Sequence, residues 1–78
     1  MEQQIKQLMA DILNLNPNTI NESTSMDSVD TWDSFNHLNL CLAMEQAFGI
    51  TLEVAEIEAI TSFRDICQTI QKKALGRS

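Results

Sequence analysis

Apolar residues recur near the amino terminus at the spacing of an amphipathic helix. The recurrence follows i, i+3, i+4, i+7 and i+8, which places the side chains on one side of a helix. These residues are Ile5, Leu8, Met9, Ile12 and Leu13. Asn14, Asn16 and Pro17 then interrupt the pattern. We therefore predict a first helix that ends at these residues.

A polar segment separates this helix from the next apolar pattern. Residues 16–33 are dominated by Asn, Ser, Thr and Asp, with single apolar residues at Ile20, Met26 and Val29. We expect these three side chains to pin the segment onto the core. A connection of this length in so small a chain is unusual and is often functional.

The second helix is predicted over residues 34–48 and ends at Gly49, which readily adopts the left-handed conformation at helix ends. At roughly 100° per residue, it carries two apolar faces. The wider face is expected to meet the core and carries Leu40, Cys41, Met44, Ala47 and Phe48. The second face carries Phe35, Leu38 and Leu42 and could be offered to partner proteins or a bound chain. The alternative is that a tight bundle buries both faces.

The last third of the chain predicts an extended run and two more helices. Residues 50–52 look extended, and apolar residues every third position then indicate a short helix with Val54, Ile57 and Ile60. A final helix begins at Thr61-Ser62, where Ser62 and Asp65 have capping-box spacing. Its stripe comprises Phe63, Ile66, Cys67 and Ile70, and it runs to about Lys73, with Lys72 and Lys73 favourably placed at its negative end. Residues 76–78 are expected to fray. The predicted fold is an all-α four-helix bundle, three longer helices and one short one, in a single domain over residues 1–78.

Composition narrows the functional classes. With 78 residues, the chain leaves no room for a substrate pocket of ordinary enzyme size beside the core. The net charge of −6 repels nucleic acids and anionic lipid headgroups, so we expect neither nucleic acid nor membrane as a partner. Basic proteins are the better match. The charge also favours a monomer.

The sequence gives no sign of a metal site or an export signal. Cys41 and Cys67 lie among apolar residues, with no His or second Cys at metal-ligand spacing. We interpret both as core residues in a reducing compartment. Asp27 and Asp30 do not extend into a calcium-loop pattern. Without a leader or an apolar run of membrane-spanning length, we expect a cytoplasmic protein.

The tetrad Trp32-Asp33-Ser34-Phe35 places one serine in the first turn of the second helix. Asp33 is a good N-cap residue. The unpaired N–H groups of this turn and the helix dipole stabilise an anion such as a phosphate here. The hydroxyl of Ser34 could therefore be a handle for covalent modification, although the same two residues could simply cap the helix.

Ser34, His37 and Asp33 also have the side chains of a hydrolase triad. Asp33 is too close in sequence to orient the imidazole from its far side, and nothing else indicates an oxyanion hole. We therefore set this interpretation aside. His37 is expected to make a polar contact near the loop or a contact with a partner.

Three motifs together resemble the acyl carrier protein family across nearly the whole chain. They are Asp33-Ser34 followed by a large apolar residue, the Leu-x-x-x-Met-Glu-x-x-Phe-Gly-Ile run over residues 40–50, and Thr61-Ser62-Phe63 before the last helix. The resemblance implies a non-catalytic carrier. A phosphopantetheinyl transferase, using coenzyme A and magnesium, would attach 4′-phosphopantetheine to Ser34. The thiol of that arm would carry acyl groups as thioesters between acyl-loading and acyl-transferring enzymes.

The resemblance also implies residue roles. Asp33 would help the transferase to recognise its target. Leu40, Met44 and Phe48 would lie in the core. The residues that would face partners are Phe35, Leu38 and Leu42, together with Glu45, the main charge of the second helix, and Glu56 and Glu58 of an acidic edge.

The chain departs from the family pattern before and within the second helix. Val29-Asp30-Thr31 and Trp32 replace the common Asp-Leu-Gly stretch, and Phe35 stands where Leu is usual. The second helix is rich in acidic residues in fatty-acid synthesis carriers, whereas here it carries Asn36, His37, Asn39 and Gln46. The acidic residues lie elsewhere: Asp27, Asp30, Glu53, Glu56 and Glu58. We infer a carrier for a specialised pathway.

Two questions stay open at this point. Fatty acyl, polyketide, hydroxyacyl and aminoacyl groups could all be the cargo, with the absence of a Gly-rich lead into Ser34 favouring acyl cargo slightly. The chain could instead be an unmodified helical adaptor that docks partners through Phe35, Leu38 and Leu42.

Overall fold

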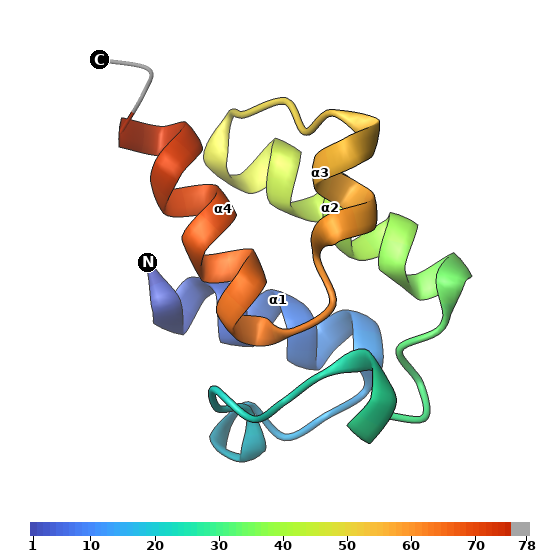
Figure 1. The fold of residues 1–78 in the computed structure, drawn as a ribbon. Helices are drawn as coiled ribbons and strands as arrows, with labels where there is room; N and C mark the ends of the chain where they lie inside the picture. Colours follow the sequence, from blue (N-terminus) through green and yellow to red (C-terminus); the bar gives the residue numbers. More distant parts are fainter. Residues whose placement is uncertain (76–78) are drawn as a thin grey trace.

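The computed structural model describes residues 1–75, which form four α-helices. They are α1 (Glu2–Leu13), α2 (Ser34–Phe48), α3 (Val54–Ala59) and α4 (Phe63–Leu75). The predicted all-α fold, with three longer helices, one short one and a long loop after the first, is confirmed (Figure 1). The predicted fraying of residues 76–78 lies outside the described residues.

The ends of α1 and α2 follow the expected stop signals. Asn14 caps α1 in the left-handed conformation with φ 57°, and Gly49 caps α2 with φ 64°. Both residue types tolerate positive φ, Gly because it has no Cβ and Asn because its short amide can bond locally. The helix boundaries predicted at these positions are therefore confirmed.

The core lies between α1, α2 and α4, each of which contacts the other two. The most deeply buried side chains include Ile5, Met9, Leu13, Leu40, Met44, Ile66 and Ile70. Leu40 and Met44 are thus buried as predicted, and Phe48 packs against the core while partly exposed. Ala47 is exposed, so its predicted place on the core face is wrong. The last turn of α2 lies at the edge of the core, where the long Phe48 side chain reaches other residues and a methyl group does not.

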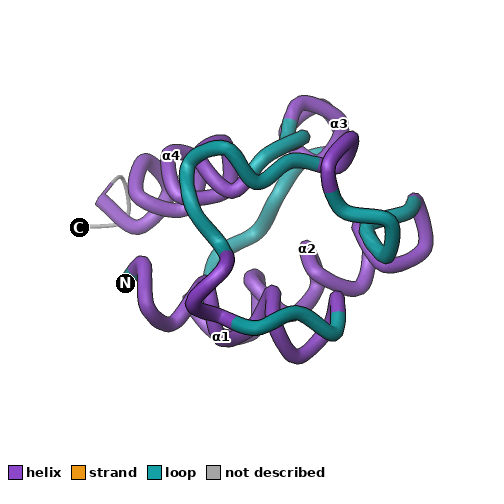
Figure 2. Tube along the Cα trace, turned by 90° about the horizontal axis from the view of Figure 1, so that it is seen from below, coloured by secondary structure: helices purple, strands orange, loops and turns teal. Residues whose placement is uncertain are grey.

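The long loop is ordered by its own contacts. It contains two 3₁₀ turns, Pro17–Thr19 and Met26–Ser28, and it passes beneath α1 and the start of α4 (Figure 1; Figure 2 views this side face-on). Ile20 is buried, and Met26 and Val29 are half-buried against the core, as predicted. The loop is also tied to the start of α4, because the Met26 N–H donates to the Thr61 carbonyl over 2.9 Å.

The start of α4 uses the expected residues in a modified way. The Asp65 N–H donates to the Ser62 hydroxyl at 3.1 Å, which is one half of a capping box. The Asp65 carboxylate, however, accepts from the N–H and the hydroxyl of Thr61, each at 3.1 Å. The helix then extends to Leu75, beyond the predicted end at Lys73.

The short helix α3 contributes no buried residue. It ends at Ala59, and Ile60, which we placed in the helical pattern, is its C-cap and is buried. The half-buried Ile57 side chain packs α3 against the core, and two polar contacts also hold α3 to its neighbours. The Ile57 carbonyl lies 2.7 Å from His37 Nε2 of α2, and the Glu56 carboxylate lies 2.7 Å from Lys73 Nζ of α4.

Candidate functional site

Ser34 is the first residue of α2 and is exposed. Asp33 precedes it as the N-cap in an extended conformation, and its carboxylate accepts the N–H of Asn36 at 2.8 Å. The predicted capping role of Asp33 is confirmed by this bond. Because Asp33 takes the third N–H of the helix, the N–H groups of Ser34 and Phe35 stay directed outward at the positive end of the helix dipole.

The turn before Ser34 is anchored to the end of α1. The Thr31 hydroxyl donates to the Leu13 carbonyl at 2.6 Å, and the Asn36 amide donates to the Thr31 carbonyl at 2.8 Å. The backbone that presents Ser34 is therefore held from both sides. Neither Thr31 nor Asn36 was recognised from the sequence as a supporting residue.

A buried chain of hydrogen bonds continues from this turn to α3. The indole N–H of Trp32 donates to Nδ1 of His37 at 3.0 Å, so Nδ1 is an acceptor. The ring is then neutral with its proton on Nε2, which donates to the Ile57 carbonyl at 2.7 Å. Trp32 is only 2% exposed and His37 8%, so the bond between them is shielded from water, whereas the bond to the Ile57 carbonyl is partly buried.

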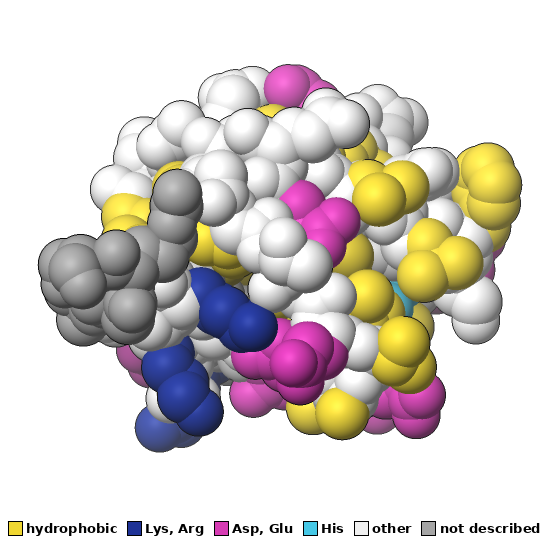
Figure 3. Space-filling model, turned by 90° about the horizontal axis from the view of Figure 1, so that it is seen from above, with side chains coloured by type: hydrophobic (Ala, Val, Ile, Leu, Met, Phe, Trp, Pro, Cys, Tyr) yellow, Lys and Arg dark blue, Asp and Glu magenta, His cyan; other side chains and the backbone are white. Residues whose placement is uncertain are grey.

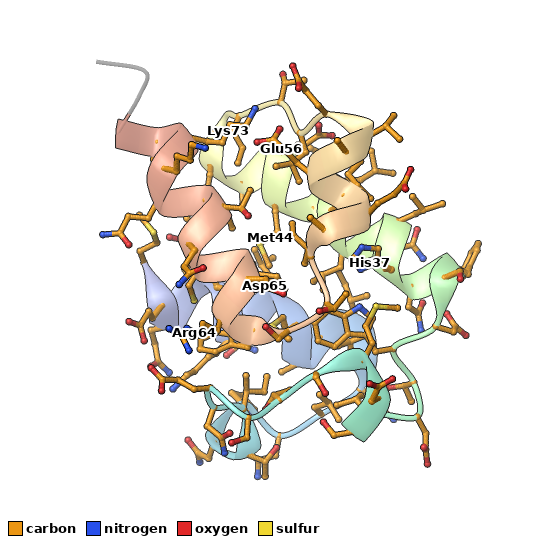
Figure 4. The ribbon with its side chains drawn as sticks, viewed as in Figure 1. His37, Met44, Glu56, Arg64, Asp65 and Lys73 are labelled. Carbon is orange, nitrogen blue, oxygen red and sulfur yellow. The ribbon has the colours of Figure 1, made fainter. Side chains whose placement is uncertain are left out.

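This arrangement decides between the interpretations of His37. Its contact with Trp32 is the polar contact near the loop that the sequence suggested. Since both ring nitrogens are occupied, the imidazole is not placed to take a proton from Ser34. Figure 4 shows His37 directed between α2 and α3. The burial of Trp32 is not among the predictions from the sequence; the signal that could have indicated it is a single tryptophan in a polar segment, five residues before the single histidine.

Four large apolar side chains are exposed on α2 and at the start of α3, and we name these four the apolar patch. Their exposed fractions are 73% for Phe35, 54% for Leu38, 56% for Leu42 and 70% for Val54. The first three share one face of α2, and Val54 begins α3. Figure 3 shows hydrophobic side chains gathered on the side of the molecule where α2 and α3 lie. The alternative that a tight bundle buries this second face is therefore wrong.

The three acidic residues predicted to contact partners, Glu45, Glu56 and Glu58, differ in how many contacts their carboxylates already make within the protein. The Glu45 carboxylate is half-buried and accepts the Leu52 N–H at 2.7 Å. Glu56 pairs with Lys73 and also accepts the Glu53 N–H at 2.9 Å, and Figure 4 shows the Glu56 and Lys73 side chains directed toward each other. The hydrogen bond from Lys73, and then that from the Glu53 N–H, lower the pKa of the Glu56 carboxyl. Glu58 is exposed.

The two cysteine thiols lie away from the tetrad in sequence, and both are free. Burial, followed by the charge of Glu45, raises the pKa of the Cys41 thiol to about 11. Burial also raises the pKa of Cys67, which is only half-buried, so its predicted place in the core is only partly correct. Within residues 1–75, no cluster of three or more His, Cys, Asp or Glu side chains could hold a metal ion.

Comparison with known proteins identifies the family. The sequence model of the family described as "Phosphopantetheine attachment site" matches residues 3–70. The chain belongs to this family. The domain that defines this family is the site of covalent 4′-phosphopantetheine attachment, so 4′-phosphopantetheine is the cofactor of this chain.

Solved structures support the fold. A crystal structure of an acyl carrier protein from Thermotoga maritima superimposes with a TM-score of 0.83 at 19% sequence identity, over 100% of this chain and 96% of that chain. At this identity, the likeness shows a shared acyl carrier protein fold. None of the curated proteins matches the chain. In the described part of the chain, no helix has the length and apolar character needed to cross a membrane.

Proposed function

We propose that Ser34 carries the 4′-phosphopantetheine arm and that the protein carries acyl intermediates as thioesters on it. The observation that supports this most is the position of Ser34. Its hydroxyl is exposed at the first position of α2, with no hydrogen-bond partner among the described residues. The neighbouring outward N–H groups and the helix dipole favour the negative phosphodiester that the reaction creates.

Activation of the serine is left to a phosphopantetheinyl transferase. A serine hydroxyl is a weak nucleophile unless a base takes its proton. His37, the nearest candidate base in sequence, has both ring nitrogens engaged with Trp32 and Ile57. The transferase would therefore supply the base, and coenzyme A would supply the arm. This chain supplies a fixed and accessible hydroxyl.

Asp33 is the second residue of the proposed attachment site. It caps α2 through the Asn36 N–H, and we infer that its carboxylate also contacts the transferase. Two substitutions separate these roles. Asp33→Asn keeps an oxygen that can cap the helix and removes the charge, whereas Asp33→Ala removes both. If Asp33 acts in recognition, both variants lose loading rate while only the alanine variant loses stability.

The arm thiol would be the site of acyl attachment. Cys41 stays protonated at neutral pH because its pKa is raised to about 11, so it is a poor competitor for acyl groups or alkylating agents. We expect iodoacetamide to label the arm of the loaded protein quickly and Cys41 slowly. Peptide mass mapping after a timed reaction measures the difference.

Phe35, Leu38 and Leu42 would face the transferase and the acyl-loading and acyl-transferring enzymes. Glu58 could contact the rim of such partners, whereas Glu45 and Glu56 each already hold a contact through one carboxylate oxygen, to the Leu52 N–H and to Lys73. The low charge of α2 favours a specialised pathway, fatty-acid-like or polyketide-like, over housekeeping fatty-acid synthesis. We further propose that the carrier works as a monomer in the cytoplasm.

Intact mass spectrometry tests the attachment directly. The purified protein is incubated with coenzyme A, magnesium and a broad-specificity phosphopantetheinyl transferase, beside Ser34→Ala. Gain of one phosphopantetheine by the wild type and no gain by the variant is the expected result. Absence of gain on folded wild-type protein contradicts the proposal and favours the unmodified adaptor, which would dock through the same three apolar residues.

A further inference from the structure

We propose that the proteins that dock on this carrier do so through an apolar recess without a central basic cluster, so that docking depends little on salt. This inference rests on the proposed carrier function and specifies the chemistry of its partners. It is carried by three observations: the absence of charge in the first eleven residues of α2, the engagement of the nearby carboxylates, and the exposure of the apolar patch.

The first eleven residues of α2, from Ser34 to Met44, contain no Asp, Glu, Lys or Arg. The polar positions between the apolar ones are Asn36 and Asn39, both half-buried and uncharged, and His37, which is buried and neutral. Between Ser34 and Met44, α2 therefore offers a partner no charge with which to pair; the exposed carboxylate beside Ser34 is that of the N-cap residue Asp33.

The carboxylates that could supply charge from nearby are largely engaged. Glu45, the only charged residue of α2, holds the Leu52 N–H, and Glu56 is bound to Lys73 and the Glu53 N–H. These contacts use Oε2 of Glu45 and Oε1 of Glu56, so a basic partner can reach only the second oxygen of each carboxylate unless a contact is given up. The cost of leaving a backbone N–H without its acceptor offsets much of the gain from a new surface ion pair.

The apolar patch is what remains available at this face. Phe35, Leu38 and Leu42 follow the i, i+3 and i+7 spacing of one helix face, and Val54 adds to them from α3. These four are nearly all of the large apolar side chains exposed in the described part of the chain; the fifth is Met1. Such gathering is typical of an interaction surface rather than of scattered exposed leucines.

The charged residues outside the apolar patch also fit a partner with an apolar recess. The described basic residues lie on α1 and α4: Lys6, Arg64, Lys72 and Lys73. Around α2 and α3, the remaining exposed acidic residues include Asp33, Glu53 and Glu58. A recess that is apolar at its centre and at most weakly basic at its rim complements this surface. Rim charges then change mainly the association rate, and apolar burial sets the affinity.

Loading kinetics test the inference, with a broad-specificity phosphopantetheinyl transferase and coenzyme A as the probe. Conversion of wild-type protein is followed by intact mass between about 50 mM and 500 mM NaCl, a range over which the screening length falls from about 14 Å to 4 Å. The apolar variant is Leu38→Gln with Leu42→Gln, which keeps the side-chain size, the neutral charge and the helix propensity. The charge variant is Glu58→Lys. The matched control is Gln46→Ala, which lies on α2 like the two substituted leucines.

We expect the apolar variant to lose about tenfold or more in kcat/KM, and salt or Glu58→Lys to change kcat/KM less than about threefold. Thermal unfolding followed by circular dichroism verifies that the variants are folded, since both substituted leucines are exposed. A loss of tenfold or more with salt and with Glu58→Lys, beside an active apolar variant, overturns the inference but leaves the carrier function intact. No loading of the folded wild type overturns the carrier function, and this inference with it.

Discussion

The turn before α2 and the short helix α3 adjoin the same exposed face but are held very differently. The turn is fixed by hydrogen bonds that join Thr31 to α1 and Trp32 and Asp33 to α2, and by the Asn36 amide of α2, which donates to the Thr31 carbonyl; Trp32 is buried. Helix α3 has no buried residue: the half-buried Ile57 side chain packs against the core, and two polar contacts, at the Ile57 carbonyl and at Glu56, tie the helix to its neighbours.

This difference indicates that the surface beside Ser34 has a rigid part, the turn, and a part that opens more easily, α3. Local opening is easiest where few groups are buried, and it is most costly where several shielded hydrogen bonds break together. The serine is therefore presented from a rigid turn, while α3 can move at low cost. His37 belongs to both regions, because one ring nitrogen binds the turn and the other binds α3.

The largest expected effect comes from His37→Ala. It removes the acceptor of the Trp32 indole N–H and the donor to the Ile57 carbonyl, and it leaves a void beneath α3. We expect a loss of roughly 2–3 kcal/mol in the free energy of unfolding. Urea unfolding followed by far-UV circular dichroism measures it.

A double-mutant cycle with Trp32→Phe sharpens this prediction. Phenylalanine keeps an aromatic ring and removes the indole N–H, so each single variant breaks the same bond. The two effects should therefore add to clearly more than the effect of the double variant. Simple additivity would contradict the assigned bond between Trp32 and His37.

An intermediate effect is expected from Thr31→Val, which keeps the side-chain shape and removes the hydroxyl that donates to the Leu13 carbonyl. The loss should be about 1 kcal/mol, because the bond is partly buried. Thr19→Val is the matched control, since the Thr19 hydroxyl donates to the Asn16 carbonyl at an exposed position. Equal losses of unfolding free energy in both variants would show that the bond from Thr31 to α1 stabilises the fold no more than an exposed local bond does.

The sequence predicted the helices because their apolar residues have strong periodicity and clear stop signals. Ile5, Met9 and Leu13 mark the buried face of α1, and Gly49 ends α2 with a positive φ. The exposed position of Ser34 and the cap at Asp33 followed from the same local rules. That residues 1–78 form one domain stays a prediction.

The sequence did not predict contacts that depend on how loops fold back onto the core. Nothing in the periodicity places Trp32 inside, because a polar loop has no repeating pattern to follow. Acidic residues are normally solvated, so the sequence predicts Glu45 and Glu56 as partner contacts. Their engagement with Leu52 and Lys73 depends on where α3 and α4 pack. The reciprocal capping of Glu53 and Glu56 at the start of α3 could have been recognised from their spacing.

The smallest expected effect on the whole fold, and the most local one, comes from Lys73→Met. Methionine keeps much of the side-chain length and removes the charge that pairs with Glu56. An isolated surface ion pair adds little to global stability, so the unfolding midpoint should hardly move. Amide hydrogen exchange at neutral pH should nevertheless speed up in α3, with no change in the turn before Ser34.

Acidification provides the same test without a substitution. Lys73 and the Glu53 N–H lower the pKa of the Glu56 carboxyl, so the folded state binds this proton less readily than the unfolded chain does. The contribution of Glu56 is therefore complete above the ordinary pKa of a glutamate and is lost as the pH falls through the lowered value. Lys73→Met lacks the hydrogen bond that lowers this pKa most, so the amide resonances of α3 should shift at a higher pH than in the wild type. The same titration midpoint in both proteins would contradict the assigned pair of Glu56 and Lys73. Exchange that speeds up equally in α3 and in the turn would mean that the two regions open together and that α3 is not the looser one.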